Sequence, residues 1–174
     1  IITTNLPAYV FQSTNRLISS SGTFINYEAI NFSGAVSNPL LTIGVDSTIV
    51  RSVVTNSSIN TLAGGIAMAG NARVTVQNCD IFMTGASGGA TGGGIVGSGP
   101  SQRVVANRVQ MSQSTSTGPA VSLQSSGQAI RNVVIGNGGL VGIYGAATTA
   151  ALTIDSNTVL GFVDGVGFIT GLTG

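Results

Sequence analysis

The chain has 174 residues, and we expect them to form a single domain over residues 1–174 with one sizeable core. Hydrophobic residues make up 43% of the chain and charged residues only 6%, and lysine, histidine and tryptophan are absent. A net charge of +1 is too small for a nucleic-acid footprint, so no nucleic-acid partner is expected. The chain also lacks an apolar run of about 18 residues, which argues against membrane insertion.

Six short segments, taken in chain order, each contain an asparagine with apolar residues close by. The first is Ile30-Asn31-Phe32, and the others lie at residues 54–59, 76–81, 105–109, 130–134 and 154–159. Their asparagines are separated by steps of 25, 22, 29, 25 and 25 residues: Asn31, Asn56, Asn78, Asn107, Asn132 and Asn157. A repeat of about 25 residues predicts a solenoid of stacked coils.

A second marker follows the first through the repeats. It is a small residue followed by an apolar one, at Gly65-Ile66, Gly94-Ile95, Ala120-Val121, Gly142-Ile143 and Gly165-Val166. Short β-branched runs bounded by Gly, Ser and Asn are typical of strands and turns, so each coil is expected to hold about three strands.

Strands of stacked coils pair about 4.8 Å apart, so equivalent residues form ladders along the axis. We predict three inward aliphatic ladders. The first contains Val54, Val76, Val105, Ile130 and Ile154, the second Ile59, Ile81, Val109, Val134 and Val159, and the third Ile66, Ile95, Val121, Ile143 and Val166. The six asparagines are interpreted as a structural ladder, because a buried amide at a tight turn can bond the backbone and its stacked neighbours.

Two variable regions interrupt the repeat. Residues 84–94 and 112–118 are rich in small and polar residues and are predicted to be loops, which either bind a ligand or pack against the rod. Arg51, Arg73 and Arg103 lie four or five residues before their asparagines and could form a basic stripe. Such a stripe would contact acidic sugars or a neighbouring subunit, whereas the alternative is three independent solvated arginines.

The sequence offers no recognisable catalytic constellation. Glycoside hydrolases need two carboxyl groups about 5 to 9.5 Å apart. Within one chain we expect no such pair among the five acidic residues, which are Glu28, Asp46, Asp80, Asp155 and Asp164. Without histidine, and with Cys79 as the single cysteine, no catalytic residue, metal site or cofactor is predicted. An active site formed by residues of two subunits is the remaining alternative.

The recurring asparagine and Gly-Ile pattern, over about residues 30–166, resembles the parallel β-helix repeats of pectate-lyase-like proteins. The resemblance implies an all-β fold, a single-stranded right-handed parallel β-helix (solenoid) of about 6 coils of roughly 25 residues. Pectate lyases use clustered aspartates and a basic residue, and this chain departs from that pattern. Phage tailspikes and fibres that look similar typically form homotrimers and present their coils to cell-surface polysaccharide.

These observations favour a non-catalytic structural or receptor-binding module of a phage tail fibre, tailspike or other virion appendage. We expect a homotrimer, cell-surface glycans as partners, and a location on a virion or at the cell surface. The apolar residues 165–169 are expected to be covered by another segment or subunit, as in a module of a longer chain. The alternatives are a polysaccharide-degrading enzyme with an intersubunit site and a secreted bacterial adhesin rod.

Overall fold

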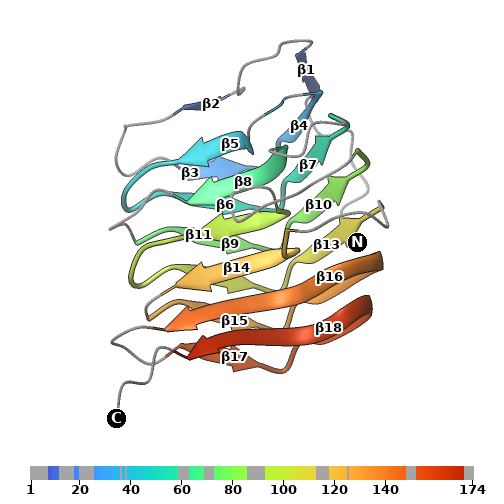
Figure 1. The fold of residues 1–174 in the computed structure, drawn as a ribbon. Helices are drawn as coiled ribbons and strands as arrows, with labels where there is room; N and C mark the ends of the chain where they lie inside the picture. Colours follow the sequence, from blue (N-terminus) through green and yellow to red (C-terminus); the bar gives the residue numbers. More distant parts are fainter. Residues whose placement is uncertain are drawn as a thin grey trace.

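The computed structural model describes residues 8–11, 18–19, 26–35, 37, 39–58, 63–68, 73–85, 93–112, 118–124, 126–147 and 152–170. These residues form eighteen strands and no helix. Figure 1 shows the strands stacked in layers along one axis, with β17 (Thr153–Asp155) and β18 (Thr158–Thr170) forming the last layer. The chain is therefore an all-β, parallel β-solenoid, as the repeat predicts.

One face of the solenoid is a six-stranded parallel sheet. In spatial order it contains β17, β15, β12, β9, β6 and β3, so five turns of the chain separate β3 from β17. Each strand has only three residues: β3 (Asn26–Glu28), β6 (Thr48–Val50), β9 (Thr75–Gln77), β12 (Arg103–Val105) and β15 (Gln128–Ile130), besides β17.

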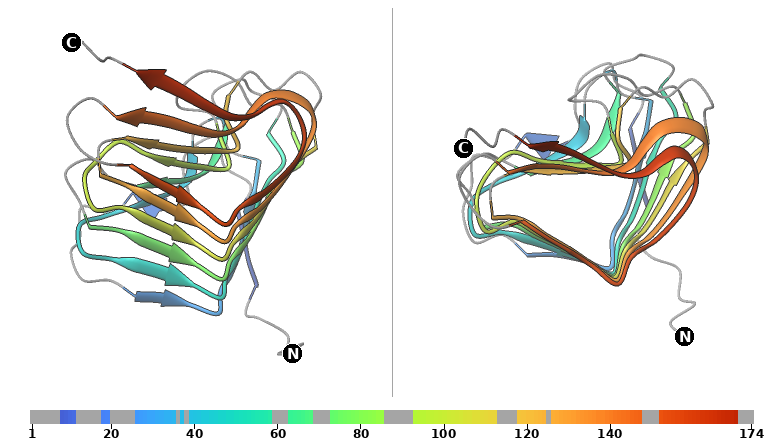
Figure 2. Two further views of the ribbon diagram at one scale, coloured as in Figure 1. Left: turned by 90° about the horizontal axis from the view of Figure 1, so that it is seen from below. Right: turned by 60° about the horizontal axis from the view of Figure 1, so that its bottom comes forward.

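A twelve-stranded sheet forms the other two faces. We call one part the β7 face, which contains β1 (Ala8–Phe11), β4 (Asn31–Gly34), β7 (Val53–Asn56), β10 (Asp80–Met83) and β13 (Arg108–Met111). The other part is the β8 face, which contains β2 (Ile18–Ser19), β5 (Pro39–Ile43), β8 (Gly64–Met68), β11 (Ile95–Gly97) and β14 (Val121–Gln124). The long strands β16 (Val133–Ala147) and β18 bend through both faces, and Figure 2 shows their curved course.

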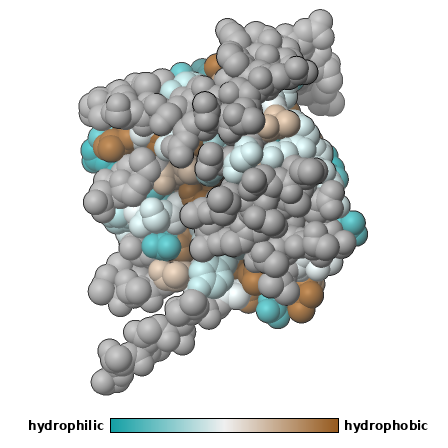
Figure 3. All heavy atoms as spheres, turned by 45° about the horizontal axis from the view of Figure 1, so that its top comes forward, coloured by the Kyte–Doolittle hydropathy of each residue, from teal (hydrophilic) through white to brown (hydrophobic). Residues whose placement is uncertain are grey.

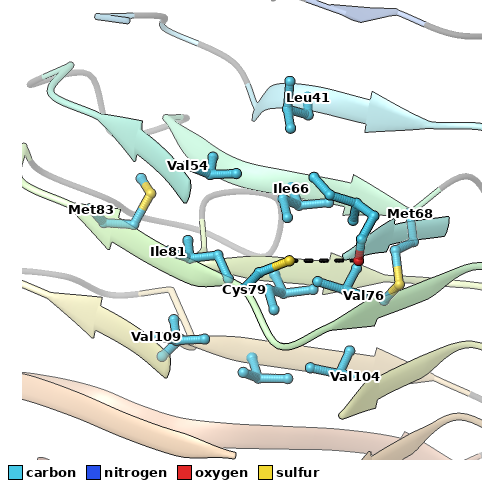
Figure 4. Close-up of a cluster of buried hydrophobic side chains, with 14 of the residues drawn as sticks. Leu41, Val54, Ile66, Met68, Val76, Cys79, Ile81, Met83, Val104 and Val109 are labelled. Carbon is cyan, nitrogen blue, oxygen red and sulfur yellow. Dashed lines mark hydrogen bonds between the residues drawn. The ribbon is translucent and has the colours of Figure 1, made fainter. Parts of the chain in front are cut away.

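The core lies between these three faces and is built from ladders of aliphatic side chains. In the third predicted ladder every step is in register, and Leu41 precedes its five members. Leu41, Ile66, Ile95 and Ile143 are at most 1% exposed. The prediction for this ladder is confirmed, and Figure 4 shows Leu41 and Ile66 within the buried cluster.

The other two predicted ladders need correction. On the β7 face the ladder is Phe32, Val54, Ile81, Val109, Val134 and Val159. Val54 thus occupies the place predicted for Ile59, which lies outside the described residues. In the six-stranded sheet the inward ladder is Tyr27, Ile49, Val76, Val104, Ala129 and Ile154, so the predictions for Val105 and Ile130 are wrong by one residue. A one-residue shift turns a side chain to the opposite face.

The small residue of the second sequence marker lies where the β7 face and the β8 face approach each other. A Cβ atom on Gly94 would lie 2.3 Å from Cγ1 of Val109, and one on Gly142 would lie 2.2 Å from Cγ1 of Val159. A Cβ atom on Gly65 would lie 2.5 Å from the backbone oxygen of Gly94. These distances are shorter than real Cβ contacts, so the aliphatic ladder of the β7 face requires glycine at these positions.

A sharp corner joins each strand of the six-stranded sheet to the next strand of the β7 face. Its first residue has a left-handed backbone with φ between 49° and 55°, at Ala29, Arg51, Asn78, Ala106, Arg131 and Ser156. The next residue, which we call the corner residue, is Ile30, Ser52, Cys79, Asn107, Asn132 or Asn157 in successive turns. The corner therefore repeats its backbone conformation in every described turn while its side chain changes.

Candidate functional site

The acidic side chains lie on different parts of the solenoid. Glu28 and Asp155 occupy equivalent outward positions of β3 and β17, the two ends of the six-stranded sheet. Five turns at a strand spacing of about 4.8 Å place them roughly 24 Å apart. Asp80 lies on the β7 face, and Asp164 lies on β18 in register with Val141. Among the described residues, no three His, Cys, Asp or Glu side chains are grouped so that they could hold a metal ion.

The three arginines predicted to form a basic stripe occupy three different positions in their turns. Arg51 is the first residue of a corner, Arg73 lies two residues before β9, and Arg103 is the first residue of β12. Arg103 and Thr75 are in register, so Arg73 and Arg103 both lie at the side of the six-stranded sheet where its strands begin. Arg51 follows the last residue of β6 and lies at the side where the strands end. The structure therefore brings two of the three residues to one side of this face.

Two of these arginines already have acidic partners. Arg51 forms an ion pair with Glu28, and Arg73 donates two hydrogen bonds to Asp46, from Nε at 2.6 Å and from Nη2 at 3.0 Å. The hydrogen bond from Arg73 holds the pKa of Asp46 below its ordinary value, and Asp46 raises the pKa of Arg73. Both arginine side chains are largely exposed, so these pairs neutralise charge on the surface more than they stabilise the fold.

Three of the six predicted asparagines meet at successive corners. Oδ1 of Asn132 accepts hydrogen bonds from the backbone nitrogen and Nδ2 of Asn107, at 2.9 and 3.1 Å. Oδ1 of Asn157 accepts the same two bonds from Asn132, at 2.8 and 2.9 Å. Each Nδ2 also donates to a backbone oxygen of the six-stranded sheet: Val76, Val104 and Ala129. We call this chain of bonds the corner ladder.

The other three predicted asparagines lie elsewhere. Asn31 begins β4, and Asn78 is the exposed left-handed residue directly before the corner residue Cys79. Asn56 is buried at the end of β7, where it donates to the oxygen of Gly64 at 2.8 Å and accepts from the nitrogen of Ser58 at 3.1 Å. Asn56 thereby fixes the turn between the β7 face and the β8 face.

In the turns that precede Asn107, other residue types continue the corner ladder. Oδ1 of Asn107 accepts from the nitrogen of Cys79 at 2.9 Å, and Oγ of Ser52 accepts from the nitrogen of Ile30 at 3.2 Å. The thiol of Cys79 lies 3.5 Å from the oxygen of Ile49. Figure 4 shows this contact. In later turns the asparagine amides donate to the equivalent backbone oxygens. Cys79 is thus a buried corner residue whose thiol also takes part in hydrogen bonding.

Burial raises the pKa of the Cys79 thiol to about 11, from an ordinary value of 9.0. The folded chain therefore prefers the neutral thiol more strongly than the unfolded chain does. This contribution to stability is fully present below about pH 9 and is lost as the pH rises toward 11. Urea titrations at pH 8 and pH 11 should show wild type losing about 2–3 kcal/mol more stability than Cys79→Ala. Equal losses in the two proteins would contradict this assignment.

A surface cluster of charged, amide and aromatic side chains on the β7 face was not predicted from the sequence. It consists of Asp80 and Phe82 on β10 and Arg108 and Gln110 on β13, and we call it the Arg108 cluster. Asp80 is in register with Arg108, and Phe82 with Gln110. The guanidinium carbon of Arg108 lies 5.7 Å from the ring centroid of Phe82, and its Nη2 donates to Oε1 of Gln110 at 3.1 Å. The equal alternation of Asp80–Met83 and Arg108–Met111 could have revealed it.

The two predicted loops lie mostly outside the described residues, at 86–92 and 113–117, so no contact of theirs enters the site. In the described part of the chain, no helix is long and apolar enough to span a membrane. In the space-filling view, hydrophilic and apolar residues are interspersed where the surface is not grey (Figure 3). No family model matches the chain, and no curated protein and no solved structure is significantly similar to it.

Proposed function

We propose that the chain is a non-catalytic structural or receptor-binding module of a phage tail fibre, tailspike or other virion appendage. It forms homotrimers and contacts cell-surface glycans. The observation that supports this proposal most directly is the Arg108 cluster on the β7 face. Asp80 and Arg108 are exposed, and Phe82 is half-buried beneath the Arg108 guanidinium.

The chemistry of the cluster suits a sugar. Sugar hydroxyl groups need both donors and acceptors, and the cluster offers a guanidinium, a carboxylate and an amide at neighbouring positions. The aromatic ring adds apolar area on which the C–H face of a sugar can pack. Because β10 and β13 are paired in register, the four side chains are held on rigid strands, which limits the entropy lost on binding.

The placement of the acidic residues supports a binding role over a hydrolytic one. Two carboxyl groups must flank a scissile bond at about 5 to 9.5 Å in a glycoside hydrolase. Here Asp46 is paired with Arg73, and Glu28 and Asp155 lie at opposite ends of one face. Asp80 is the one carboxylate in the Arg108 cluster.

Arg108→Ala is expected to weaken glycan binding about tenfold or more, because hydrogen bonds to a charged group are lost. The wild-type chain is first screened on an array of bacterial surface polysaccharides. The best-retained polysaccharide is then titrated into wild type and variant by calorimetry. Light scattering on the same sample should give the mass of a trimer of the 17.3 kDa chain.

The matched control is Arg131→Ala, which removes an exposed arginine that lies at a corner and is not a member of the cluster. It should bind the polysaccharide as wild type does. Retention of no polysaccharide, or equal binding by Arg108→Ala and wild type, would reject the glycan site. Release of reducing sugar by the wild-type chain would reject the non-catalytic assignment and favour the enzyme alternative.

A further inference from the structure

Strand β16 carries an asparagine–glycine pair where it bends. Residues 133–135 of this strand are in register with β13 and residues 143–146 with β14, so residues 136–142 lead from the β7 face to the β8 face. Figure 2 shows this bend. Asn137 and Gly138 lie within it, and both are exposed. Asn137 is the only asparagine of the chain that is followed by glycine.

The backbone of β16 is bulged at this pair. The register with β18 passes from Ile135 opposite Leu160 to Gly139 opposite Phe162, so residues 136–138 of β16 lie opposite the single residue Gly161. In the described part of the chain, Gly138 is in register with no residue of β13, β14 or β18. A bulge of this kind leaves its extra residues outside the ladder. The φ of Gly138 is 82°, a conformation that glycine adopts readily.

The asparagines of the corner ladder are held quite differently. Each of their side-chain amides donates to a backbone oxygen of the six-stranded sheet. The backbone nitrogen that follows each of them also donates a hydrogen bond, from Arg108 to Cys79 at 2.9 Å, from Val133 to Asn107 at 2.8 Å and from Thr158 to Asn132 at 2.8 Å. Both groups are therefore engaged in the ladder.

We propose that Asn137 is a site of spontaneous deamidation, with water as the reagent. The backbone nitrogen of Gly138 loses its proton and forms a bond to Cγ of Asn137, and the side-chain nitrogen leaves as ammonia. Water then opens the resulting five-membered succinimide. Breaking its N–Cγ bond yields aspartate, and breaking the bond between the nitrogen and the backbone carbonyl carbon yields isoaspartate. One water molecule is consumed and one ammonia released, without oxidation or reduction.

The contacts of the pair favour this reaction. Gly138 has no Cβ atom to obstruct the approach of its nitrogen to Cγ. The one hydrogen bond of the Asn137 side chain, from Nδ2 to the oxygen of Ser112 at 3.2 Å, is exposed, and water can replace it. The product adds one negative charge to a net charge of +1 and so leaves none, which favours association of the chain. This inference does not depend on glycan binding at the Arg108 cluster.

The test is mass spectrometry of the folded full chain after incubation at mildly alkaline and mildly acidic pH. Trypsin cleaves after arginine, and Arg131 is the last arginine, so one peptide contains Asn132, Asn137 and Asn157. This peptide should gain about one dalton, located at Asn137 by fragmentation. The gain should be faster at alkaline pH, because the attacking nitrogen must lose its proton. Asn132 and Asn157 should react at least about tenfold more slowly, since their hydrogen bonds must break first.

Asn137→Gln is the matched control, because its amide would have to close a larger ring, and it should show no gain of mass. A synthetic peptide of residues 133–141 gives the rate without the fold, and the folded chain should react within about tenfold of it. An unchanged mass of the folded chain under conditions in which the peptide reacts would overturn the proposal. Equal reaction at Asn132 or Asn157, or the same gain in Asn137→Gln, would also overturn it.

Discussion

Replacing Asn132 by alanine is expected to lower the free energy of unfolding by about 3 kcal/mol. Asn132 is 1% exposed. Its side chain accepts two hydrogen bonds from Asn107 and donates to the oxygen of Val104 and to Oδ1 of Asn157, both at 2.9 Å. Alanine leaves these buried groups without partners, and each such loss costs about 1–3 kcal/mol. Urea denaturation followed by circular dichroism measures the change.

Asn137→Ala, in the strand β16 that follows Asn132, provides the comparison. The Asn137 side chain is exposed and makes one hydrogen bond, to the oxygen of Ser112 at 3.2 Å. Water can replace that bond, so the loss should be below about 0.5 kcal/mol. A similar effect of the two substitutions would show that burial in the corner ladder does not decide their cost.

Gly94→Ala is expected to destabilise the chain by about 3 kcal/mol through overpacking. Its new Cβ atom would lie 2.3 Å from Cγ1 of Val109 and 2.7 Å from the backbone oxygen of Ala120. Neither neighbour can retreat easily, because Val109 is fully buried and Ala120 accepts a backbone hydrogen bond from Ile95. The midpoint of urea unfolding should fall without a change in its slope.

Two further variants isolate the steric cause. Gly165 occupies the equivalent position in the last turn, where a Cβ atom would meet nothing within 4 Å, so Gly165→Ala should be close to neutral. The double variant Gly94→Ala with Val109→Ala should lose clearly less than the two single variants combined, because the second change removes the clashing methyl group. Additive losses would point to a cause other than this contact.

The β8 face could be predicted residue by residue because it carries two signals. Glycine or alanine precedes each inward aliphatic residue, so Ile66 and its mates had only one consistent register. The six-stranded sheet carries less information. Each of its strands has three residues with one inward side chain, and β-branched residues occupy outward positions as well, as at Ile130. Alternation over three residues cannot settle the register.

The corner ladder could be predicted only in part because its backbone does not demand one residue type. Ser52 and Cys79 occupy the corner in earlier turns and make bonds similar to those of asparagine there. The prediction from repeated asparagines therefore included Asn56 and Asn78, which lie close to a corner in sequence but not at the corner position. The Arg108 cluster was missed because its members come from two turns and only register brings them together.

The uniform stacking of turns also bears on how the chain folds. In the six-stranded sheet, paired residues such as Ile49 and Val76, or Ala129 and Ile154, are one repeat apart in sequence. No pairing there requires a distant part of the chain to be captured first, so the entropy of loop closure is similar for each added turn. Assembly can start at any well-packed pair of turns and extend in both directions, with opening fluctuations concentrated in the outermost layers.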